Sequence, residues 1–202
     1  RETYETNVMG TVNLLDAVRQ VDSIKVVVNI TSDKCYENKE MIWGYRESDS
    51  MGGYDPYSSS KGCSELVTSA YRRSFFNPQE MSEHGVALAS VRAGNVIGGG
   101  DWAKDRLMTD CIESLQEGRE IEIRSPQAIR PWQHVLEPLS GYLLLAANLY
   151  NEPEKYIGGW NFGPDESSIV TVGELVERII DHWGAGGWKD ISSNNEPHEA
   201  EL

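Results

Sequence analysis

The sequence predicts an α/β fold that forms part of a doubly wound parallel sheet. Two short, mainly apolar runs, residues 25–30 and 86–91, have the length and hydrophobicity of parallel strands that are covered on both faces. A long helical pattern, residues 57–77, lies between them. Because parallel neighbours need a long crossover connection, we expect this strand, helix and strand to form one βαβ unit.

The other segments continue this alternation along the chain. Residues 2–20 place apolar side chains at helical spacing and predict an amphipathic helix. Residues 36–55, rich in Glu, Ser, Gly and Tyr, predict a long loop, a kind of segment that is often functional. The remaining predictions are a loop at 98–102, a helix at 105–117, a short strand at 121–124, a loop at 125–133, a helix at about 134–150, an extended segment at 159–163, a helix at 172–183 capped by Thr171 and Glu174, and a polar, poorly ordered tail from Ser192.

The composition narrows the settings in which the protein works. The 202 residues suffice for one substantial core, or for a domain with part of another. The 18 basic against 32 acidic residues give a net charge of −14, which argues against a general nucleic-acid or anionic-membrane surface. The longest apolar stretch, residues 142–149, is too short to span a membrane. Cys35, Cys63 and Cys111 form no C-x-x-C pattern and favour a reducing, cytoplasmic setting, and no His has metal-ligand spacing, so we expect no metal.

Tyr57 and Lys61 are the first candidate catalytic pair. Four residues along a helix is about one turn, so the two side chains share a face and lie roughly 6 Å apart. A phenol beside an ammonium ionises more easily, which suits a general base for an alcohol that loses its proton while a hydride leaves carbon. The alternative is a helix-surface pair that contributes about 0.2–0.5 kcal/mol to stability.

Ser32, Asp33 and Lys34 follow the strand predicted at 25–30. They therefore lie at the carboxyl end of a parallel strand, where open sheets place their chemistry. The alternative reading is structural, because Ser and Asp favour turns and caps at strand ends, and Lys34 is then a solvent-exposed lysine.

Five motifs in a fixed order carry a family resemblance. They are Thr6–Thr11, Thr31–Lys34, Tyr57 with Lys61, Arg92–Gly98 and Arg130–Val135. This order resembles the extended short-chain dehydrogenase/reductases, the NAD-dependent epimerases and dehydratases, and among them the sugar-nucleotide dehydratases. The resemblance covers essentially the whole chain. It implies that residues 1–95 are the C-terminal half of an NAD-binding Rossmann-type domain, and that residues 96–202 are mainly a small, incomplete α/β substrate-binding domain, with the helix at 134–150 interleaved.

The glycine fingerprint of such a domain is missing. A dinucleotide fold carries G-x-G-x-x-G on its first strand-to-helix turn, where helix N–H groups hold the pyrophosphate. Neither residues 98–100 nor residues 184–187 have that spacing after a strand. The resemblance therefore implies that the first βα units precede Arg1. We expect the chain to be a fragment that lacks the adenosine side of the NAD site and is inactive alone.

The resemblance assigns roles to four of the candidate residues. Tyr57 would take the proton of the sugar 4-hydroxyl, and Lys61 would lower the pKa of that phenol and bind the nicotinamide ribose. Ser32 would hydrogen-bond the reacting 4-oxygen. Asp33 would protonate the departing 6-hydroxyl, for which burial must raise its pKa.

Lys34 divides the members of the family. The commoner dTDP-glucose dehydratases have Glu there as the base for the C5 proton, whereas the Asp33-Lys34 pair resembles the branch that acts on CDP-glucose. A lysine is a base only when neutral, so the C5 base stays open between Lys34 and Tyr57. Two alternatives to a dehydratase remain. One is an NAD-dependent 4-epimerase or decarboxylase, in which position 33 carries no acid, and the other is a fragment that only binds sugar nucleotide.

The resemblance also implies how substrate and partner are bound. Asn95 and Arg130 match positions that hold the nucleotide diphosphate, and Arg106 is a weaker third candidate; the guanidinium fork suits phosphate oxygens. The alternative for Arg130 is a surface ion pair worth under about 1 kcal/mol. Residues 2–20 and 57–77 would form a four-helix bundle in a homodimer, and the product would serve deoxysugar biosynthesis, including that of lipopolysaccharide O-antigens.

Overall fold

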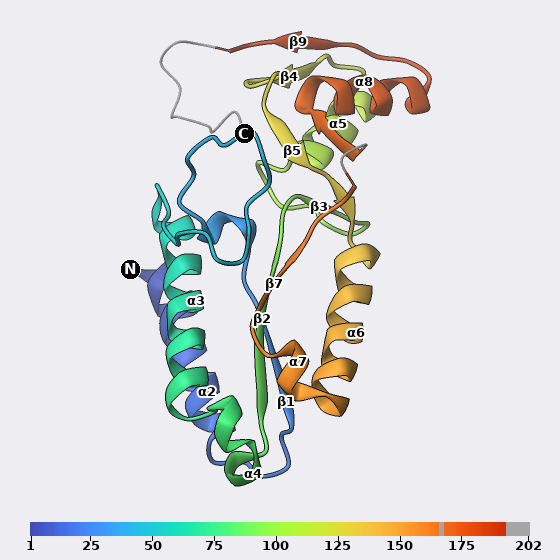
Figure 1. Cartoon of the computed structure of the whole chain (residues 1–202). Coiled ribbons are helices and arrows are strands. Elements are labelled where there is room, and N and C mark those ends of the chain that lie inside the picture. Colours follow the sequence, from blue (N-terminus) through green and yellow to red (C-terminus); the bar gives the residue numbers. More distant parts are fainter. Residues whose placement is uncertain (166–167, 193–202) are drawn as a thin grey trace. The chain divides into compact units, whose positions relative to one another are not determined.

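The computed structural model describes residues 1–165 and 168–192 (Figure 1). They form two compact units. The first combines Arg1–Gly94 with Leu136–Phe162, and the second combines Asn95–Val135 with the described residues from Gly163 onward. The chain therefore passes from one unit to the other three times. The polar tail predicted from Ser192 falls, from residue 193, outside the described residues.

The first unit is built on a parallel three-stranded sheet. Its strands are β1 (Val26–Ile30), β2 (Ala87–Ala93) and β7 (Gly159–Phe162), in the order β1-β2-β7. Helix α3 (Pro56–Ser74) connects β1 to its parallel neighbour β2, which confirms the predicted βαβ unit. Figure 1 shows α3 on one side of this sheet and α6 (Leu136–Asn151) on the other. The sheet is thus covered by helices from both sides, as in doubly wound folds.

Alternation along β2 divides the core into two clusters, because successive side chains of a strand point to opposite faces. Towards the carboxyl end, the face of β2 that carries Leu88 continues with the polar Ser90 and Arg92, both buried. This face of β2 therefore changes from apolar to polar towards the carboxyl end of the strand. The clusters are Leu15, Val18, Phe76, Val86 and Leu88 on one face, and Ala87, Ala89, Val91, Leu145 and Leu149 on the other.

The helix predicted at residues 2–20 is present but interrupted. It consists of α1 (Glu2–Tyr4), a π-helical turn (Glu5–Met9) and α2 (Gly10–Val18). π-Turns inside helices are often found at functional sites. Here the turn contains Asn7, whose amide nitrogen donates to Ser60 Oγ of α3 at 2.9 Å. The two helices are therefore joined by polar contacts as well as by apolar packing.

Strand β1 differs from the expectation that both of its faces are covered. Its residues are half-buried, and Ile30 is 54% exposed, because β1 is an edge strand of the three-stranded sheet. The polar Asn29 occurs in this strand because it bonds to α3. Its amide nitrogen donates to Thr68 Oγ1 at 2.7 Å and to Ser64 Oγ at 3.2 Å. The predicted strand is confirmed, but the prediction that both of its faces are covered was wrong.

Replacing two glycines of this unit by alanine should change the free energy of unfolding in opposite directions. A Cβ on Gly141 of α6 would lie 2.2 Å from the Phe162 ring, so Gly141→Ala is expected to lower the free energy of unfolding by about 1–3 kcal/mol. A Cβ on Gly10 of α2 meets nothing within 4 Å among the described residues, so Gly10→Ala should raise it by about 0.5–1 kcal/mol. Urea denaturation of both variants checks this, and an unchanged Gly141→Ala protein would contradict the close packing.

The described residues of the second unit form two helices and three short strand pairs. Its core consists of Cys111, Leu115, Ile121, Ile123 and Val176. β3 pairs in parallel with β6, β4 in parallel with β9, and β5 antiparallel with β8. The elements are β3 (Val96–Ile97), α5 (Leu107–Gln116), β4 (Ile121–Ile123), β5 (Ile129–Pro131), β6 (Gln133–His134), β8 (Ile169–Thr171), α8 (Val172–Trp183) and β9 (Trp188–Asp190).

The prediction of a loop at residues 125–133 was wrong, because this stretch contains paired strands. It contains all of β5 and the first residue of β6. Each of these strands pairs with a segment far away in the sequence, β5 with β8 and β6 with β3, so neither leaves a local periodic signal. The capping box of α8 was predicted correctly: Thr171 Oγ1 accepts from the backbone N–H of Glu174 at 3.1 Å, and Glu174 Oε2 accepts from that of Thr171 at 2.9 Å.

The remaining elements are short and lie in the first unit. The long loop predicted at 36–55 is confirmed, since it carries only one isolated bridge, between Tyr36 and Met51. The short elements are a 3₁₀ turn (Asp33–Cys35), a second 3₁₀ turn (Pro78–Glu80), α4 (Met81–His84) and α7 (Pro153–Tyr156).

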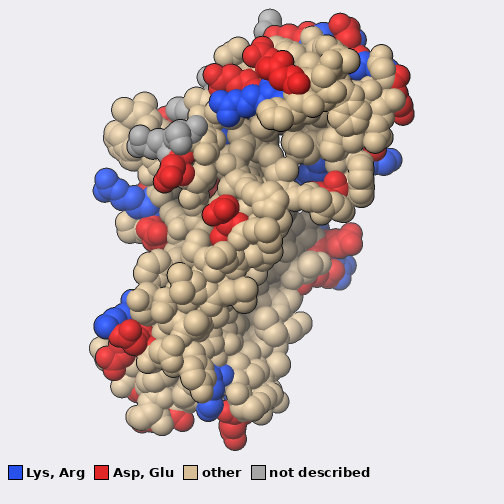
Figure 2. Space-filling model, turned by 90° about the vertical axis from the view of Figure 1, so that its right-hand side faces the viewer, with Lys and Arg blue, Asp and Glu red and all other residues tan. Residues whose placement is uncertain are grey.

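The surface carries charge of both signs. Figure 2 shows acidic and basic side chains scattered over one face, with wide uncharged areas between them. Helix α6 contributes exposed apolar side chains, among them Leu143, which is 74% exposed. None of the helices in the described ranges combines the length and the hydropathy needed to cross a membrane.

Candidate active site

Two residues at the start of helix α3 end the preceding loop and begin the helix. Asp55 is its N-cap and Pro56 its first residue, a combination that ends extended chain and starts a helix. Asp55 Oδ1 accepts from the backbone N–H of Tyr57 at 2.8 Å and from that of Ser58 at 3.1 Å. The cap places Tyr57 in the first turn of the helix. Sequence reasoning missed Asp55, although Asp before Pro at a helix start is a readable signal.

Tyr57 and Lys61 lie together on α3 as predicted. The Lys61 ammonium nitrogen is 5.7 Å from the centroid of the Tyr57 ring. The Tyr57 side chain is open to solvent at 49% exposure, whereas Lys61 is half-buried, and burial lowers the pKa of its ammonium. Within the described part of the chain, no ion pair of Lys61 is present. A phenol that a ligand can reach thus lies beside a cation whose donors are available.

Ser32, Asp33 and Lys34 form a tight turn at the carboxyl end of β1. Ser32 caps the 3₁₀ turn by accepting from the backbone N–H of Lys34 at 3.2 Å, and its hydroxyl donates to Asp33 Oδ1 at 2.9 Å. Ser32 and Asp33 are half-buried and Lys34 is exposed. The deep burial that the sequence argument required for Asp33 is therefore not present in this structure. Its carboxyl is partly open to solvent and accepts a hydrogen bond from Ser32.

This turn packs directly against α3, so the two predicted segments meet. The backbone carbonyl of Cys35 accepts from the N–H of Gly52 at 2.9 Å, and a Cβ on Gly62 would lie 2.7 Å from the Gly52 carbonyl oxygen. Only glycine permits this approach, one residue after Lys61. Cys35 is fully buried, and burial raises the pKa of its thiol to about 12, so it stays protonated.

Lys34 and Asp55 are electrostatic neighbours across this contact. Burial raises the pKa of the Asp55 carboxyl, but the hydrogen bonds from Ser58 and from the Tyr57 backbone, together with the charge of Lys34, lower it more. The net pKa of Asp55 is below its ordinary value. Lys34 therefore lies near the start of α3, close to the segment that carries Tyr57.

A buried ion pair lies beneath these segments and was missed from the sequence. Glu65 of α3 and Arg92 of β2 are 3% and 5% exposed, and Arg92 donates Nε to Glu65 Oε1 at 2.8 Å and Nη2 to Glu65 Oε2 at 2.9 Å. Thr31 and Ser90 also donate to this carboxylate, at 2.5 and 2.7 Å. Sequence reasoning noted Arg92 only as part of a motif, since nothing local pairs it with a glutamate 27 positions earlier.

The three predicted diphosphate residues all belong to the second unit. Asn95 directly precedes β3, and its carbonyl accepts from the N–H of Gln133 of β6 at 3.0 Å, whereas Arg130 lies in β5, which pairs with β8. Arg130 is half-buried and donates Nη1 to the Ile129 carbonyl at 2.7 Å. Arg106 is exposed at the start of α5, 3.9 Å from the Asp101 carboxylate.

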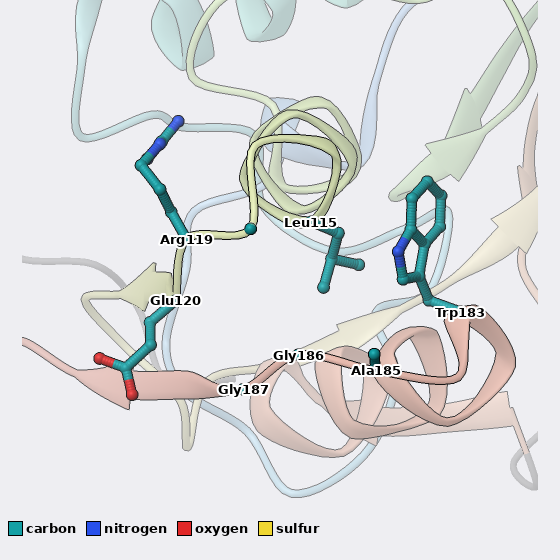
Figure 3. A pocket seen from close by; sticks show the side chains of 8 residues that line it. Leu115, Arg119, Glu120, Trp183, Ala185, Gly186 and Gly187 are labelled. Carbon is teal, nitrogen blue, oxygen red and sulfur yellow. The ribbon is translucent and has the colours of Figure 1, made fainter.

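The second unit also contains a cavity of about 450 Å³. Figure 3 shows Leu115 facing it across from Trp183, with the charged ends of Arg119 and Glu120 pointing away. None of the predicted site residues lines it, and its described lining offers few convergent polar groups. In the described ranges, no group of three or more His, Cys, Asp or Glu is arranged to hold a metal ion.

Comparison with known proteins finds a family model and curated relatives that match this chain. The family model described as the NAD dependent epimerase/dehydratase family matches residues 1–158. The chain is 60% identical over 199 residues to CDP-glucose 4,6-dehydratase from Salmonella typhimurium, covering 98% of this chain and 55% of that protein. The chain spans about half the length of the curated relatives it matches.

Solved structures support the fold. The dTDP-glucose 4,6-dehydratase from Bacillus anthracis, in complex with NAD, matches with a TM-score of 0.76 at 23% identity, over 98% of this chain and 58% of that one. The UDP-glucose 4-epimerase of Thermus thermophilus, also with NAD, matches with a TM-score of 0.74 at 20% identity, over 95% and 59%. These likenesses confirm the predicted Rossmann-type fold class, and the motif order agrees with the family match. The chain belongs to the NAD dependent epimerase/dehydratase family.

Proposed function

We propose that the full-length protein carrying this chain is a sugar-nucleotide 4,6-dehydratase that converts CDP-D-glucose to CDP-4-dehydro-6-deoxy-D-glucose and water. The observation that carries the proposal is the 60% identity to a CDP-glucose 4,6-dehydratase over nearly the whole chain. The side chains of the first unit agree with it, because a phenol, an ammonium, a hydroxyl and a carboxyl occur on two segments in contact.

The reaction assigns each of these groups a proton or a hydrogen bond. Tyr57 accepts the proton of the sugar 4-hydroxyl as C4 is oxidised, and Ser32 hydrogen-bonds that oxygen. The resulting ketone acidifies the C5 hydrogen, which Lys34 or Tyr57 removes. Asp33, whose carboxyl a bound sugar would bury, protonates the 6-hydroxyl, which departs as water. C6 then receives the hydride that left C4, and C5 regains a proton, so the reaction overall is a dehydration without net oxidation.

The residues on α3 fit a nicotinamide cofactor. Lys61 is a half-buried ammonium without an ion pair in the described part of the chain, so its donors are available to the hydroxyls of a ribose. Lys61 and Tyr57 are the residues that would hold that part of NAD. Bound NAD would supply reversible hydride acceptance, from C4 and back to C6.

Asn95 and Arg130 are our proposal for diphosphate binding, with Arg106 as a weaker third. Their support is placement and charge. The Asn95 carbonyl bonds to Gln133, which follows Arg130 by three residues, and the guanidinium group is a strong donor to phosphate in a chain whose net charge is −14. The small substrate-binding domain that we propose includes these segments, and the choice of CDP rests on the relative and on the Asp33-Lys34 pair.

The direct test is product formation by the full-length protein. Incubation with CDP-glucose should yield a 4-ketone, which absorbs near-ultraviolet light in base, and dTDP-glucose should yield little of it. A sugar inverted at C4, without ketone, would overturn the dehydratase and favour an epimerase. Ketone from dTDP-glucose alone would overturn the choice of nucleotide.

The Asp33→Asn variant separates elimination from oxidation. We expect ketone formation to fall by about 10²–10⁴-fold, because the amide cannot deliver a proton to the leaving hydroxyl. Oxidation of the substrate, read as the absorbance of reduced nicotinamide, should persist. Asp33→Glu, which keeps an acid, is the control and should retain more product than the amide. Equal activity of Asp33→Asn and the parent would remove Asp33 from the mechanism.

We also propose a homodimer that pairs the helical segments at residues 2–20 and 57–77. It is supported by large apolar side chains exposed on these helices, of which Leu14 at 57% and Leu66 at 59% are the most open. A monomer in light scattering at micromolar concentration would contradict the dimer. The cysteines Cys35, Cys63 and Cys111 are unpaired in the structure, which fits a cytoplasmic enzyme of deoxysugar biosynthesis.

A further inference from the structure

The turn that carries Asp33 is fastened at both ends to the same buried ion pair. Before the turn, Thr31 Oγ1 donates to Glu65 Oε1 at 2.5 Å. After it, the Tyr36 hydroxyl accepts from Arg92 Nη1 at 2.5 Å and donates to Asn161 Oδ1 of β7 at 2.7 Å. Both flanking residues are buried, Thr31 at 8% and Tyr36 at 5% exposure.

The other end of the same pair belongs to the helix of the proposed base. Glu65 follows Lys61 by one helical turn and Tyr57 by about two, so the three side chains lie along one face of α3. One carboxylate therefore joins the strand-end turn, through Thr31, to the helix face that carries Tyr57 and Lys61.

The carboxylate of the pair is hydrogen-bonded on both oxygens, which holds the pair in one geometry. Each oxygen of Glu65 accepts two hydrogen bonds, from Arg92 and Thr31 on one and from Arg92 and Ser90 on the other. Arg92 has further acceptors in the Tyr36 hydroxyl and, at 3.2 Å, in the Glu47 carbonyl. Burying two charges is costly, and stability alone is weak grounds for such a pair, whereas a fully bonded network fixes one geometry.

We infer that Glu65 and Arg92 are positioning residues that hold the Ser32–Cys35 turn in register with the Tyr57–Lys61 face of α3. The inference rests on the proposed function for its catalytic consequence. Proton removal at the 4-hydroxyl and proton delivery at the 6-hydroxyl involve groups on both segments. A misplacement of about 1 Å between catalytic groups can cost about 10²-fold in rate, so the spacing of the two segments must be held.

Two isosteric variants loosen the turn without breaking the ion pair. Tyr36→Phe removes the tie at its end, and Thr31→Val removes the tie at its start. Ser90→Ala is the matched control, because it removes a hydrogen bond to the same carboxylate from β2 rather than from a residue beside the turn. All three are made in the full-length protein.

The first readout is amide hydrogen exchange, which needs no substrate. The backbone N–H groups of Cys35 and Tyr36 bond to the Ser32 and Asp33 carbonyls and report on opening of the turn. We expect their exchange to accelerate about tenfold in Tyr36→Phe and in Thr31→Val, as expected for the loss of one hydrogen bond, and to stay unchanged in Ser90→Ala.

The second readout is the split between kcat and KM in ketone formation. The two turn variants should lose about 10- to 100-fold in kcat with KM little changed, and Ser90→Ala should lose less than either. Unchanged exchange in both turn variants overturns the inference, as does a Ser90→Ala protein that behaves like them, since the network would then act on stability alone. If the parent protein forms no ketone, the proposed dehydratase fails, and the exchange result still decides the positioning role.

Discussion

Tyr57→Phe in the full-length protein is expected to lower kcat for ketone formation by about 10³-fold, with KM nearly unchanged. The ring, its place in the first turn of α3 and its contact with Lys61 are retained, and only the hydroxyl is lost. Without that oxygen, the proton of the sugar 4-hydroxyl has no acceptor at this position when C4 is oxidised. Steady-state kinetics with CDP-glucose measures the effect.

Tyr71→Phe is the matched control on the same helix. Its hydroxyl donates to Asp16 Oδ1 at 2.9 Å, on α2, so the variant also loses one phenolic hydrogen bond. We expect its kcat to stay within about twofold of the parent, because changes far from catalytic groups are usually small. Comparable losses in both variants would mean that Tyr57 acts through the fold rather than through proton transfer.

Arg92→Met is expected to lower the free energy of unfolding by about 3–5 kcal/mol, the usual cost of removing one partner from a buried ion pair. It leaves the Glu65 carboxylate buried at 3% exposure without its guanidinium, and it also removes a partner of the Tyr36 hydroxyl. Urea denaturation monitored by tryptophan fluorescence measures the loss.

Lys155→Met supplies the control within the same unit. Lys155 pairs with Glu152 on the surface, where both side chains are largely solvated, so its loss should cost under about 1 kcal/mol. An Arg92→Met protein no less stable than Lys155→Met would show that the buried pair contributes nothing net to the fold.

The Glu65–Arg92 pair should also make the stability of the protein depend on pH. Burial raises the pKa of Glu65, but hydrogen bonds from Arg92 and Thr31 and the charge of Arg92 lower it more, so the folded pKa is below the ordinary value of 4.5. The contribution of the pair to stability is therefore present above pH 4.5 and is lost as pH falls through the folded pKa. In Arg92→Met the hydrogen bonds from Thr31 and Ser90 remain, but those from Arg92 and its charge are lost, so the pKa of Glu65 rises and acidification should narrow the gap in stability to the parent.

Elements with a local signal were predicted well from the sequence. β1 and β2 are mainly apolar runs, and α3 follows a long helical pattern, although its Asp-Pro start is a local signal that was missed. The strands β3, β5 and β6 are two or three residues long, and their partners lie elsewhere in the chain. A strand of that length is defined by its partner rather than by its own pattern, so the prediction of a loop at 125–133 was wrong.

The candidate site divides in the same way. The Tyr57–Lys61 spacing and the Ser32-Asp33-Lys34 strand end are read from adjacent residues, and the structure brings the two segments together. The Glu65–Arg92 pair depends on the register of β2 against α3, which no local pattern encodes. The one sequence hint is on β2 itself, where Ser90 and Arg92 interrupt an apolar strand on a single face.

The division of the first unit between two stretches of sequence has a consequence for its synthesis. β2 ends at Ala93, but its parallel neighbour β7 begins only at Gly159. A ribosome that adds about 5–20 residues per second therefore makes β7 on the order of several seconds after β2. For the first part of that interval, until α6 is made, the face of β2 that receives α6 lacks this helix, and residues 95–135 of the second unit emerge first. The nascent chain thus passes through a stage in which an apolar strand awaits its neighbour, the stage at which a chaperone would bind it.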